Sequence, residues 1–215
     1  MIDLHTHSIF SDGELIPSEL VRRAIVCGYE AIAITDHVDF SNIEPVLKGI
    51  KKVKYLEEEW NIRVIAGVEL THIPPRKIER LATYARKLGA ELIVAHGETP
   101  VEPVASGTNK AAINTDIDIL AHPGFISIED TEGAKQNDIY LEITARAGHN
   151  MTNGYVAKVA EQCSANLLVN TDAHSPYDLI TSETAFKVAI GAGLKYEYAK
   201  NIISRNPLDI IKRID

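Results

Sequence analysis

The sequence predicts an α/β barrel built from about seven strand–helix units. Short apolar runs alternate with longer segments of helical periodicity along the chain, and this alternation is typical of a parallel sheet with right-handed crossovers. The apolar runs are rich in β-branched residues and leucine without clean polar alternation, as expected for strands buried on both faces. Polar residues follow nearly every strand, which favours a closed barrel over an open doubly wound sheet.

Seven segments fit the pattern of a buried strand. They are Ile2–His5, Ala31–Thr35, Arg63–Val68, Leu92–Ala95, Ile117–Ala121, Ile139–Ile143 and Asn166–Asn170. The helix pattern is clearest in Pro17–Cys27, which begins at a proline and stops at Gly28. The other expected helices are Ile43–Trp60, Arg76–Leu88, Asn109–Asn114, Thr131–Gln136, Thr152–Cys163, Tyr177–Gly191 and one or two closing helices in Tyr196–Ile214.

The composition predicts one soluble globular domain over residues 1–215, with 45% hydrophobic and 24% charged residues. The net charge of −8 argues against a general nucleic-acid or membrane-surface binder, so no stable nucleic-acid partner is expected. No leader sequence is visible, and no apolar run approaches the ~20 residues of a membrane helix, so the expected location is cytoplasmic. Cys27 and Cys163 fall in predicted helices with apolar neighbours, which predicts small buried thiols without a disulfide.

The placement of histidine is the main functional signal. The chain has eight histidines, and none lies in a predicted helix. Six terminate a predicted strand or lie within a residue or two of its end: His5, His7, His37, His96, His122 and His174. The C-terminal ends of barrel strands converge on one face, where residues far apart in sequence meet. A lone histidine is more often structural, but six at equivalent positions indicate one shared site.

Carboxylates accompany these histidines at ligand spacing. In His5-Thr6-His7 the two imidazoles point to the same side of a strand, and Asp172-Ala173-His174 repeats this arrangement with a carboxylate. Asp12 lies in a turn that can fold back over the first strand end, and Glu69 follows an apolar strand. Imidazole and carboxylate donors together suit zinc, manganese or iron, so the series predicts a metal site.

The series resembles the PHP family, the polymerase and histidinol phosphatase domains. The matching segments are His5-Thr6-His7 with Ser11-Asp12-Gly13, Thr35-Asp36-His37, Gly67-Val68-Glu69, His96, Ala121-His122-Pro123-Gly124 and Thr171-Asp172-Ala173-His174-Ser175. The resemblance implies a distorted TIM-like (β/α)7 barrel with two or three divalent metal ions at its mouth. Because the chain holds no polymerase, a free-standing phosphoesterase fits better than a polymerase-attached module.

Carried over by position, the resemblance implies three ligand sets that share Glu69 as a bridge. The first ion takes His5, His7, Glu69 and Asp172, the second takes Glu69, His96 and His122, and the third takes Asp12, His37 and His174. Neighbouring carboxylates are candidates for orienting the ligand imidazoles, with a salt bridge elsewhere as the alternative for Asp3. These carboxylates are Asp3, Asp36, Glu98 and Glu142.

The chemistry implied is hydrolysis of a small-molecule phosphate monoester. Two cations bridged by Glu69 would share a hydroxide nucleophile, and the ions would stabilise charge developing on the phosphoryl oxygens. The proton donor for the leaving alcohol stays open among Asp172, His174 and a metal-bound water. Glu69, Asp172 and His174 are therefore the expected catalytic residues.

Candidate substrate contacts lie in loops after the strands. Arg146 could grip phosphate oxygens, and Asn109-Lys110 could bring a cation and helix N-terminal amides to a phosphate. His149 is balanced between substrate contact and loop hydrogen bonding. Each charge could equally be a solvated surface group. His72 is expected to be structural, because Pro74-Pro75 indicates a stiff turn that leads away.

Three other functions stay open. A phosphodiesterase acting on nucleotides or short oligonucleotides ranks second, because the acidic balance and 6% aromatic content offer little for base stacking. A barrel that hydrolyses C–N or lactone bonds ranks lower, because no predicted strand carries a lysine near its end. A non-catalytic metal-binding module would keep the same ligands without turnover.

Overall fold

The computed structural model, which describes residues 1–214, contains a parallel sheet that curves into a barrel. Neighbouring strands pair in the order β1 (Ile2–Asp3), β2 (Ala31–Ile34), β4 (Arg63–Leu70), β5 (Leu92–His96), β6 (Ile119–Ala121), β7 (Tyr140–Thr144) and β8 (Leu167–Asn170). A short strand, β3 (His37–Val38), pairs with the end of β4. All these pairings are parallel.

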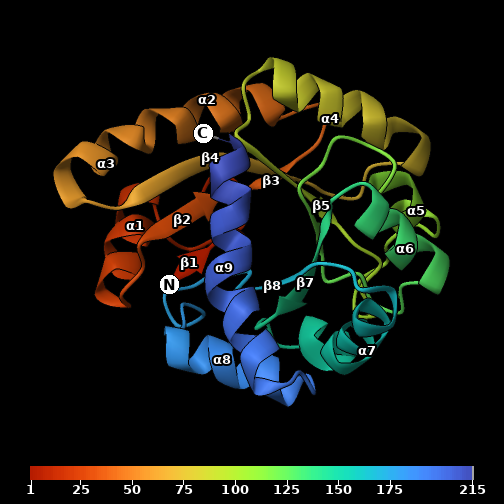
Figure 1. The fold of residues 1–215 in the computed structure, drawn as a ribbon. Helices are drawn as coiled ribbons and strands as arrows, with labels where there is room; N and C mark the ends of the chain where they lie inside the picture. Colours follow the sequence, from red (N-terminus) through yellow and green to blue (C-terminus); the bar gives the residue numbers. More distant parts are fainter. Residues whose placement is uncertain (215) are drawn as a thin grey trace.

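Backbone contacts between the two edge segments bring the ring close to closure. Thr6, just after β1, forms a parallel bridge with Ala173, just after β8. The His7 amide donates to the Ala173 carbonyl at 2.9 Å, and the Asp172 amide donates to the His5 carbonyl at 3.0 Å. Figure 1 shows the strands inside a ring of helices. The predicted distorted TIM-like barrel is therefore confirmed, and its closure joins the segments that carry the first and last expected metal ligands.

Helices α1 to α8 follow the strands and cover the outside of the sheet (Figure 1). In α1 the apolar residues Leu20, Val21 and Ala24 are buried, and Pro17 occupies the first turn, where a missing amide costs no helical hydrogen bond. The α-helices are α1 (Pro17–Val26), α2 (Ile43–Lys51), α3 (Tyr55–Trp60), α4 (Ile78–Lys87), α5 (Thr108–Ala112), α6 (Ile128–Gln136), α7 (Asn153–Cys163), α8 (Ser182–Gly191) and α9 (Tyr196–Ile214). Three 3-10 turns, η1 (Lys52–Lys54), η2 (Pro75–Lys77) and η3 (His149–Thr152), join or precede helices.

Several predicted elements differ from the structure. The helix expected over Ile43–Trp60 is divided by η1 into α2 and α3. The helix expected from Tyr177 begins at Ser182, because the Asp178 carboxylate accepts hydrogen bonds from nearby backbone amides and holds this segment in a turn. Strand β3 was not predicted, since it has only two residues and depends on the long β4 for its pairing.

The two cysteines also differ from the prediction. Both are free thiols, as expected, but both are partly exposed instead of buried. Cys27 caps the C-terminal end of α1, and Cys163 is the last residue of α7, where it lies beside the start of α6. Their positions at helix ends on the outside of the barrel explain the exposure.

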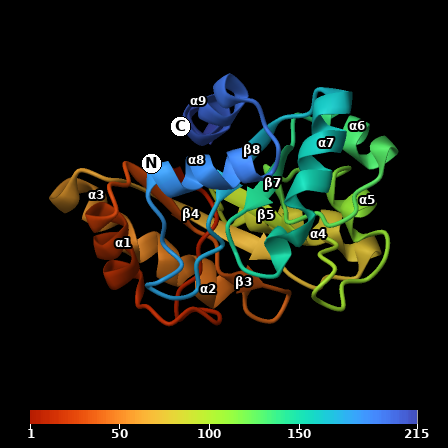
Figure 2. The ribbon, with the colours of Figure 1, turned by 90° about the horizontal axis from the view of Figure 1, so that it is seen from below.

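The core has two layers, one between sheet and helices and one inside the barrel. The inner layer contains Ile65, Val94 and Leu168 from three strands together with Ile210 from α9. Helix α9 therefore closes the N-terminal end of the barrel. Figure 2 shows α9 at one end and β3 toward the other. This arrangement leaves the C-terminal strand ends open for a site. Among residues 1–214 there is no helix both long and apolar enough to cross a membrane.

Candidate metal centre

The eight histidines form one connected cluster at the C-terminal ends of the strands. Each imidazole has another histidine ring with its centroid within 6.3 Å. The carboxylates Asp12, Glu69 and Asp172 contact imidazoles of this cluster. The structure thus brings together all nine residues that the sequence predicts as metal ligands, although they are spread from residue 5 to residue 174.

A tight turn after β1 carries Asp12 back over the strand end. The Asp36 carboxylate accepts hydrogen bonds from the amides and hydroxyls of Ser8 and Ser11, at 2.7–3.1 Å. Gly13 lies against the His7 backbone so closely that a Cβ would stand 2.5 Å from the His7 carbonyl oxygen. Asp36 therefore organises the turn and does not orient an imidazole.

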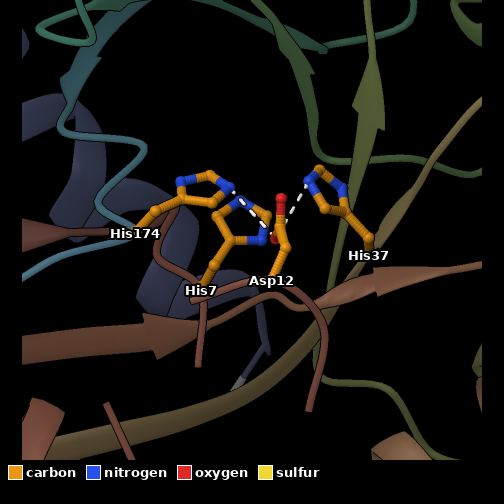
Figure 3. A group of neighbouring side chains, drawn as sticks. All are labelled: His7, Asp12, His37 and His174. Carbon is orange, nitrogen blue, oxygen red and sulfur yellow. Dashed lines mark ion pairs between the residues drawn. The ribbon is translucent and has the colours of Figure 1, made fainter. Parts of the chain in front are cut away.

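One ligand group lies at the side of the mouth nearest to this turn. Ligand atoms of His7, Asp12, His37 and His174 all lie within 4.8 Å of one another. The Asp12 carboxylate lies between two imidazoles, 3.5 Å from Nε2 of His37 and 3.2 Å from Nε2 of His174 (Figure 3). This group contains the three ligands expected for the third ion and adds His7.

A second, deeper group surrounds Glu69 and Asp172. Nε2 of His5 lies 3.4 Å from Glu69 Oε1, and Nε2 of His7 lies 3.2 Å from Asp172 Oδ1. His122 contributes its Nε2 at 3.7 Å from both carboxylates. All five side chains are at most 3% exposed. A cation in this position would be shielded from water by protein on all sides except the mouth.

Four imidazoles contact protein groups at Nδ1, which leaves Nε2 for the cluster in His5, His96 and His174, whereas Nδ1 of His37 also lies 2.7 Å from Glu69 Oε2. This arrangement is characteristic of metal-bound histidines, where the second nitrogen fixes the ring orientation. The Nδ1 partners are Glu142 Oε1 for His5 at 2.8 Å, Thr71 Oγ1 for His37 at 2.6 Å, the Gly97 carbonyl for His96 at 3.1 Å and the Asp172 carbonyl for His174 at 2.9 Å. Of the four carboxylates considered for this role, Glu142 performs it.

Unsatisfied polar atoms concentrate in the same place. Residues 1–214 contain nine buried side-chain nitrogen or oxygen atoms without a hydrogen bond of acceptable geometry, and eight belong to His5, His7, Glu69, His122, His149 and Asp172. Burying a polar group without a partner costs about 1–3 kcal/mol. Such a concentration indicates that the partner is a ligand, and imidazole and carboxylate donors in this arrangement fit divalent metal ions.

Burial and opposite charges shift the pKa values of the cluster in different directions. Burial raises the pKa of Asp172 to about 7, even though His5 acts in the opposite direction. For Glu69, burial also favours the neutral form, but the charges of His5 and His37 outweigh it and hold the pKa well below its usual range. Burial lowers the pKa of His7 and His122. Neutral imidazoles with free nitrogens are suitable metal ligands.

The backbone is strained at members of the cluster. His72, His122 and Asp172 have φ values of 52°, 27° and 53°, in the left-handed region that non-glycine residues rarely adopt. Residues in such conformations concentrate at functional sites, because the surrounding fold has to hold them there. The conformation directs these side chains into the mouth of the barrel.

Two of the predicted substrate contacts lie at the cluster. Arg146 Nη1 is 2.7 Å from His174 Nδ1 and donates to the Asp172 carbonyl at 3.1 Å, and its side chain is 30% exposed. His149 is buried, with its ring centroid 4.4 Å from that of His122. Both therefore lie beside residues that the sequence predicts as metal ligands.

The other two predicted substrate contacts are used elsewhere. The Asn109 side chain is buried and bonds the Glu98 amide at 2.9 Å and the Pro123 carbonyl at 2.8 Å, so it ties two loops together. Glu98 in turn accepts the Asn109 amide and does not orient an imidazole. Lys110 is exposed and pairs with Glu129 of α6 at 3.0 Å, outside the mouth. In this structure neither side chain is therefore free at the mouth, and the phosphate contacts predicted for Asn109 and Lys110 are not seen.

Two residues at the cluster, His72 and Glu102, were not predicted to belong to the site. Nε2 atoms of both His72 and His96 lie near Glu102, at 3.5 and 3.0 Å. His72 follows β4, which continues to Leu70, so it has the same strand-end position as the other histidines. A longer predicted strand would have revealed it, whereas the expected turn away from the site was wrong. Glu102 lies in the loop between β5 and α5 and carries no comparable sequence signal.

Within residues 1–214, Asp3 forms no ion pair, and it is not one of the cluster residues. Its buried carboxylate accepts hydrogen bonds from the Thr171 hydroxyl at 2.6 Å and the Tyr29 hydroxyl at 3.3 Å. The Thr171 contact joins β1 to the segment after β8, and the Tyr29 contact joins β1 to the segment before β2. Asp3 therefore supports the closure of the barrel beside Asp172, and the salt bridge considered from the sequence does not form.

A nearly closed parallel barrel with imidazoles and carboxylates gathered at its strand ends is the arrangement implied by the PHP resemblance. Residues 3–100 match the PHP domain family, and the chain belongs to this family. The chain is 54% identical over 215 residues to the uncharacterized protein MJ1295 of Methanocaldococcus jannaschii, covering 99% of both chains. The ligands after residue 100, including His122 and Asp172, lie beyond the matched region.

More distant relatives carry functional names. A protein named as a probable phosphatase from Caldanaerobacter subterraneus is 28% identical over 94% of this chain and 87% of its own length. Ribonuclease P protein component 3 of Methanosarcina barkeri is 25% identical over 98% of this chain and 88% of its own length. A chain in the cryo-EM structure of archaeal ribonuclease P with mature tRNA has a similar fold, with a TM-score of 0.72 and 16% identity, over 100% of this chain and 89% of that chain.

Proposed function

We propose that this protein is a metal-dependent phosphoesterase that hydrolyses a phosphate monoester of a small molecule. The observation that carries the proposal is the concentration, in six side chains at the mouth, of eight buried nitrogen and oxygen atoms that form no hydrogen bond. Membership of the PHP family and a relative named as a phosphatase support phosphoester chemistry. The expected partner is therefore a small phosphorylated substrate.

Two groups of residues would hold the catalytic ions. His5, His7, Glu69, His122 and Asp172 supply the deeper position, and Asp12, His37 and His174 supply the position beside the turn. The three ligands expected for the second ion do not form one group in the structure. Ligand atoms of Glu69 and His122 lie within 4.8 Å of one another and of His5, whereas those of His96 lie within this distance of His72 and Glu102. Divalent ions held there supply an activated water nucleophile and stabilise developing negative charge.

The residues of the chain contribute positioning and proton transfer. Arg146 is the one guanidinium in contact with the described cluster, and its planar group suits two phosphate oxygens. His174 and Asp172 lie next to this guanidinium, at 2.7 and 3.6 Å from its nitrogens. They are the proposed donors of the proton for the leaving alcohol. Glu69 would hold ions through both of its carboxylate oxygens.

A nucleotide phosphodiesterase is the second candidate, and exposed aromatic side chains favour it. Phe125, Tyr155 and Tyr177 are 70%, 37% and 92% exposed and follow β6, β7 and β8. Aromatic rings near a hydrolytic site can stack on nucleobases, at about 1–3 kcal/mol per base. Three exposed rings in the segments after these strands would offer surfaces for base stacking, although aromatic residues make up only 6% of the chain.

The test measures turnover of an aryl phosphate and an aryl phosphodiester with zinc, manganese and iron in turn. Preferential monoester cleavage supports the proposal, and preferential diester cleavage supports the second candidate. Cleavage of neither, with metal bound, would indicate a non-catalytic module. His7→Ala and Glu69→Gln should abolish turnover with the fold retained, while the exposed Lys110→Ala should not change it. Near-normal activity of either ligand variant would contradict the proposed centre.

A further inference from the structure

Glu102 reaches the cluster from the loop between β5 and α5. Its Oε2 lies 3.0 Å from Nε2 of His96, and its Oε1 lies 3.3 Å from Nε2 of His149. The Glu102 side chain is 36% exposed, whereas that of Glu69 is fully buried. Glu102 is thus a carboxylate in contact with an expected metal ligand, and the proposed hydrolysis assigns it no role.

His96 connects Glu102 to the metal centre around Glu69. The His96 ring centroid lies 4.5 Å from that of His122, and Nε2 of His122 lies 3.7 Å from Glu69 Oε1. Nδ1 of His96 faces the Gly97 carbonyl at 3.1 Å, which leaves Nε2 as the metal-binding atom of this ring. Because Glu102 contacts the same Nε2, an ion that His96 binds within the centre would be within reach of Glu102 as well.

The separation of these two ligand atoms fits one shared ion. Zinc lies about 2.0–2.1 Å from an imidazole nitrogen and about 2.0–2.2 Å from a carboxylate oxygen, so ligand atoms around a tetrahedral ion are about 3.3 Å apart. The 3.0 Å between His96 Nε2 and Glu102 Oε2 is close to this value. A hydrogen bond between the two groups would have a similar length, so a second observation has to favour the ligand.

The charge of the centre is this second observation. The nine expected ligands comprise six imidazoles, which bind metal in the neutral form, and three carboxylates. Three negative charges are fewer than the four to six positive charges of two or three divalent ions, so a further anion would stabilise the centre. Glu142 does not supply it, because it contacts Nδ1 of His5 and not a metal-binding nitrogen. Glu102 has both the charge and the contact.

We propose that Glu102 is a further ligand of the metal centre and binds the same ion as His96. This inference rests on the metal centre of the proposed function. His72 and His149 hold the carboxylate on both of its oxygens, with Nε2 atoms 3.5 Å from Oε2 and 3.3 Å from Oε1. The loop between β5 and α5 thereby takes part in metal binding, beside the strand ends that carry the expected ligands.

The test compares metal binding by the full-length wild type, Glu102→Gln, His96→Ala and the double variant. Competition with a chromophoric chelator measures zinc affinity, and the visible absorption of bound cobalt reports its donor set. Glu102→Gln should weaken binding of one ion by at least the about 10-fold that loss of an outer-shell partner costs, and it should change the cobalt spectrum. Glu129→Gln, an exposed change on α6, is the matched control and should equal the wild type.

The sign and the additivity of the effects separate a ligand from other roles. A hydrogen-bond partner that the ion displaces would give the opposite sign, because its removal frees His96 and strengthens binding. A charge acting at a distance would add its effect to that of His96→Ala, whereas a shared ion predicts that Glu102→Gln costs less than about twofold in the His96→Ala background. Stronger or unchanged binding by Glu102→Gln, or additive losses, would overturn the assignment.

Failure of the proposed hydrolysis is a separate outcome, because metal binding is measured without substrate. Bound ions without turnover would leave Glu102 as a ligand and remove the hydrolase, whereas a chain that binds neither zinc nor cobalt would overturn both proposals. Circular dichroism checks that the variants fold, and the partly exposed Glu102 lies outside the core.

Discussion

Glu142 Oε1 lies 2.8 Å from Nδ1 of His5, with both side chains fully buried beneath the metal centre. The same oxygen accepts from Asn170 Nδ2 at 2.9 Å, and the other oxygen accepts from the His122 amide at 3.1 Å. The carboxylate thus receives donors on both oxygens. A hydrogen bond from Nδ1 of His5 to Glu142 orients the ring so that Nε2 is turned toward the proposed cations.

Glu142→Gln should therefore weaken metal binding about 10- to 100-fold without altering any proposed ligand. The substituted amide has one donor and one acceptor end, so one end has to face a donor in either orientation. Competition with a chromophoric chelator measures the affinity. Unchanged zinc affinity would show that Glu142 does not orient His5.

Gly13→Ala should destabilise the protein by about 1–3 kcal/mol, because the added Cβ would stand 2.5 Å from the His7 carbonyl oxygen. The turn that carries Asp12 has to shift to relieve this contact, so binding of the ion beside Asp12 should weaken as well. Urea unfolding and zinc titration measure the two effects. The control is Gly191→Ala at the end of α8, where no atom lies within 4 Å of the added Cβ and no loss of stability is expected.

The buried carboxyl of Asp3 should make the free energy of unfolding depend on pH, and one substitution can isolate this contribution. Burial raises the pKa of Asp3 from 3.8 to about 6, although Thr171 opposes the shift. The folded state therefore binds the proton more tightly than the unfolded state does. The stabilisation is present in full below pH 4 and is lost as the pH rises through about 6.

Asp3→Asn should remove this dependence. The difference in unfolding free energy between wild type and Asp3→Asn should fall by about 3 kcal/mol between pH 3.5 and pH 6.5, at ~1.4 kcal/mol per pKa unit. Urea unfolding of both proteins across this range measures it. A difference that stays constant, or that grows with pH, would show that the buried carboxyl keeps its ordinary pKa.

Ile210→Ala should destabilise the protein by about 2–5 kcal/mol, because this fully buried side chain of α9 fills the N-terminal end of the barrel. Leu208→Ala, on the same helix at 42% exposure, is the control and should change stability by less than about 0.5 kcal/mol. Thermal and urea unfolding report both values. Equal effects of the two substitutions would mean that α9 does not seal the barrel.

The sequence was sufficient to predict the barrel and to select nine residues that the structure brings together, because each of them carries a local signal. Buried parallel strands appear in the sequence as apolar runs. The functional residues of a barrel lie directly after these strands, at their C-terminal ends. His5 and Asp172 are recognisable from their positions after such runs, without knowledge of how the barrel closes. His72 was not recognised as a strand-end residue, because β4 continues to Leu70, two residues beyond the predicted end of this strand.

Only the tertiary structure determined which of these residues are neighbours and what the remaining polar groups do. Asn109 and Arg146 have similar sequence signals, yet one ties two loops together and the other reaches the cluster. Glu102 joins three imidazoles although nothing in its own segment indicates it. The physical reason is that a strand pattern fixes which end of the barrel a residue occupies, whereas the path of a loop depends on contacts with distant segments.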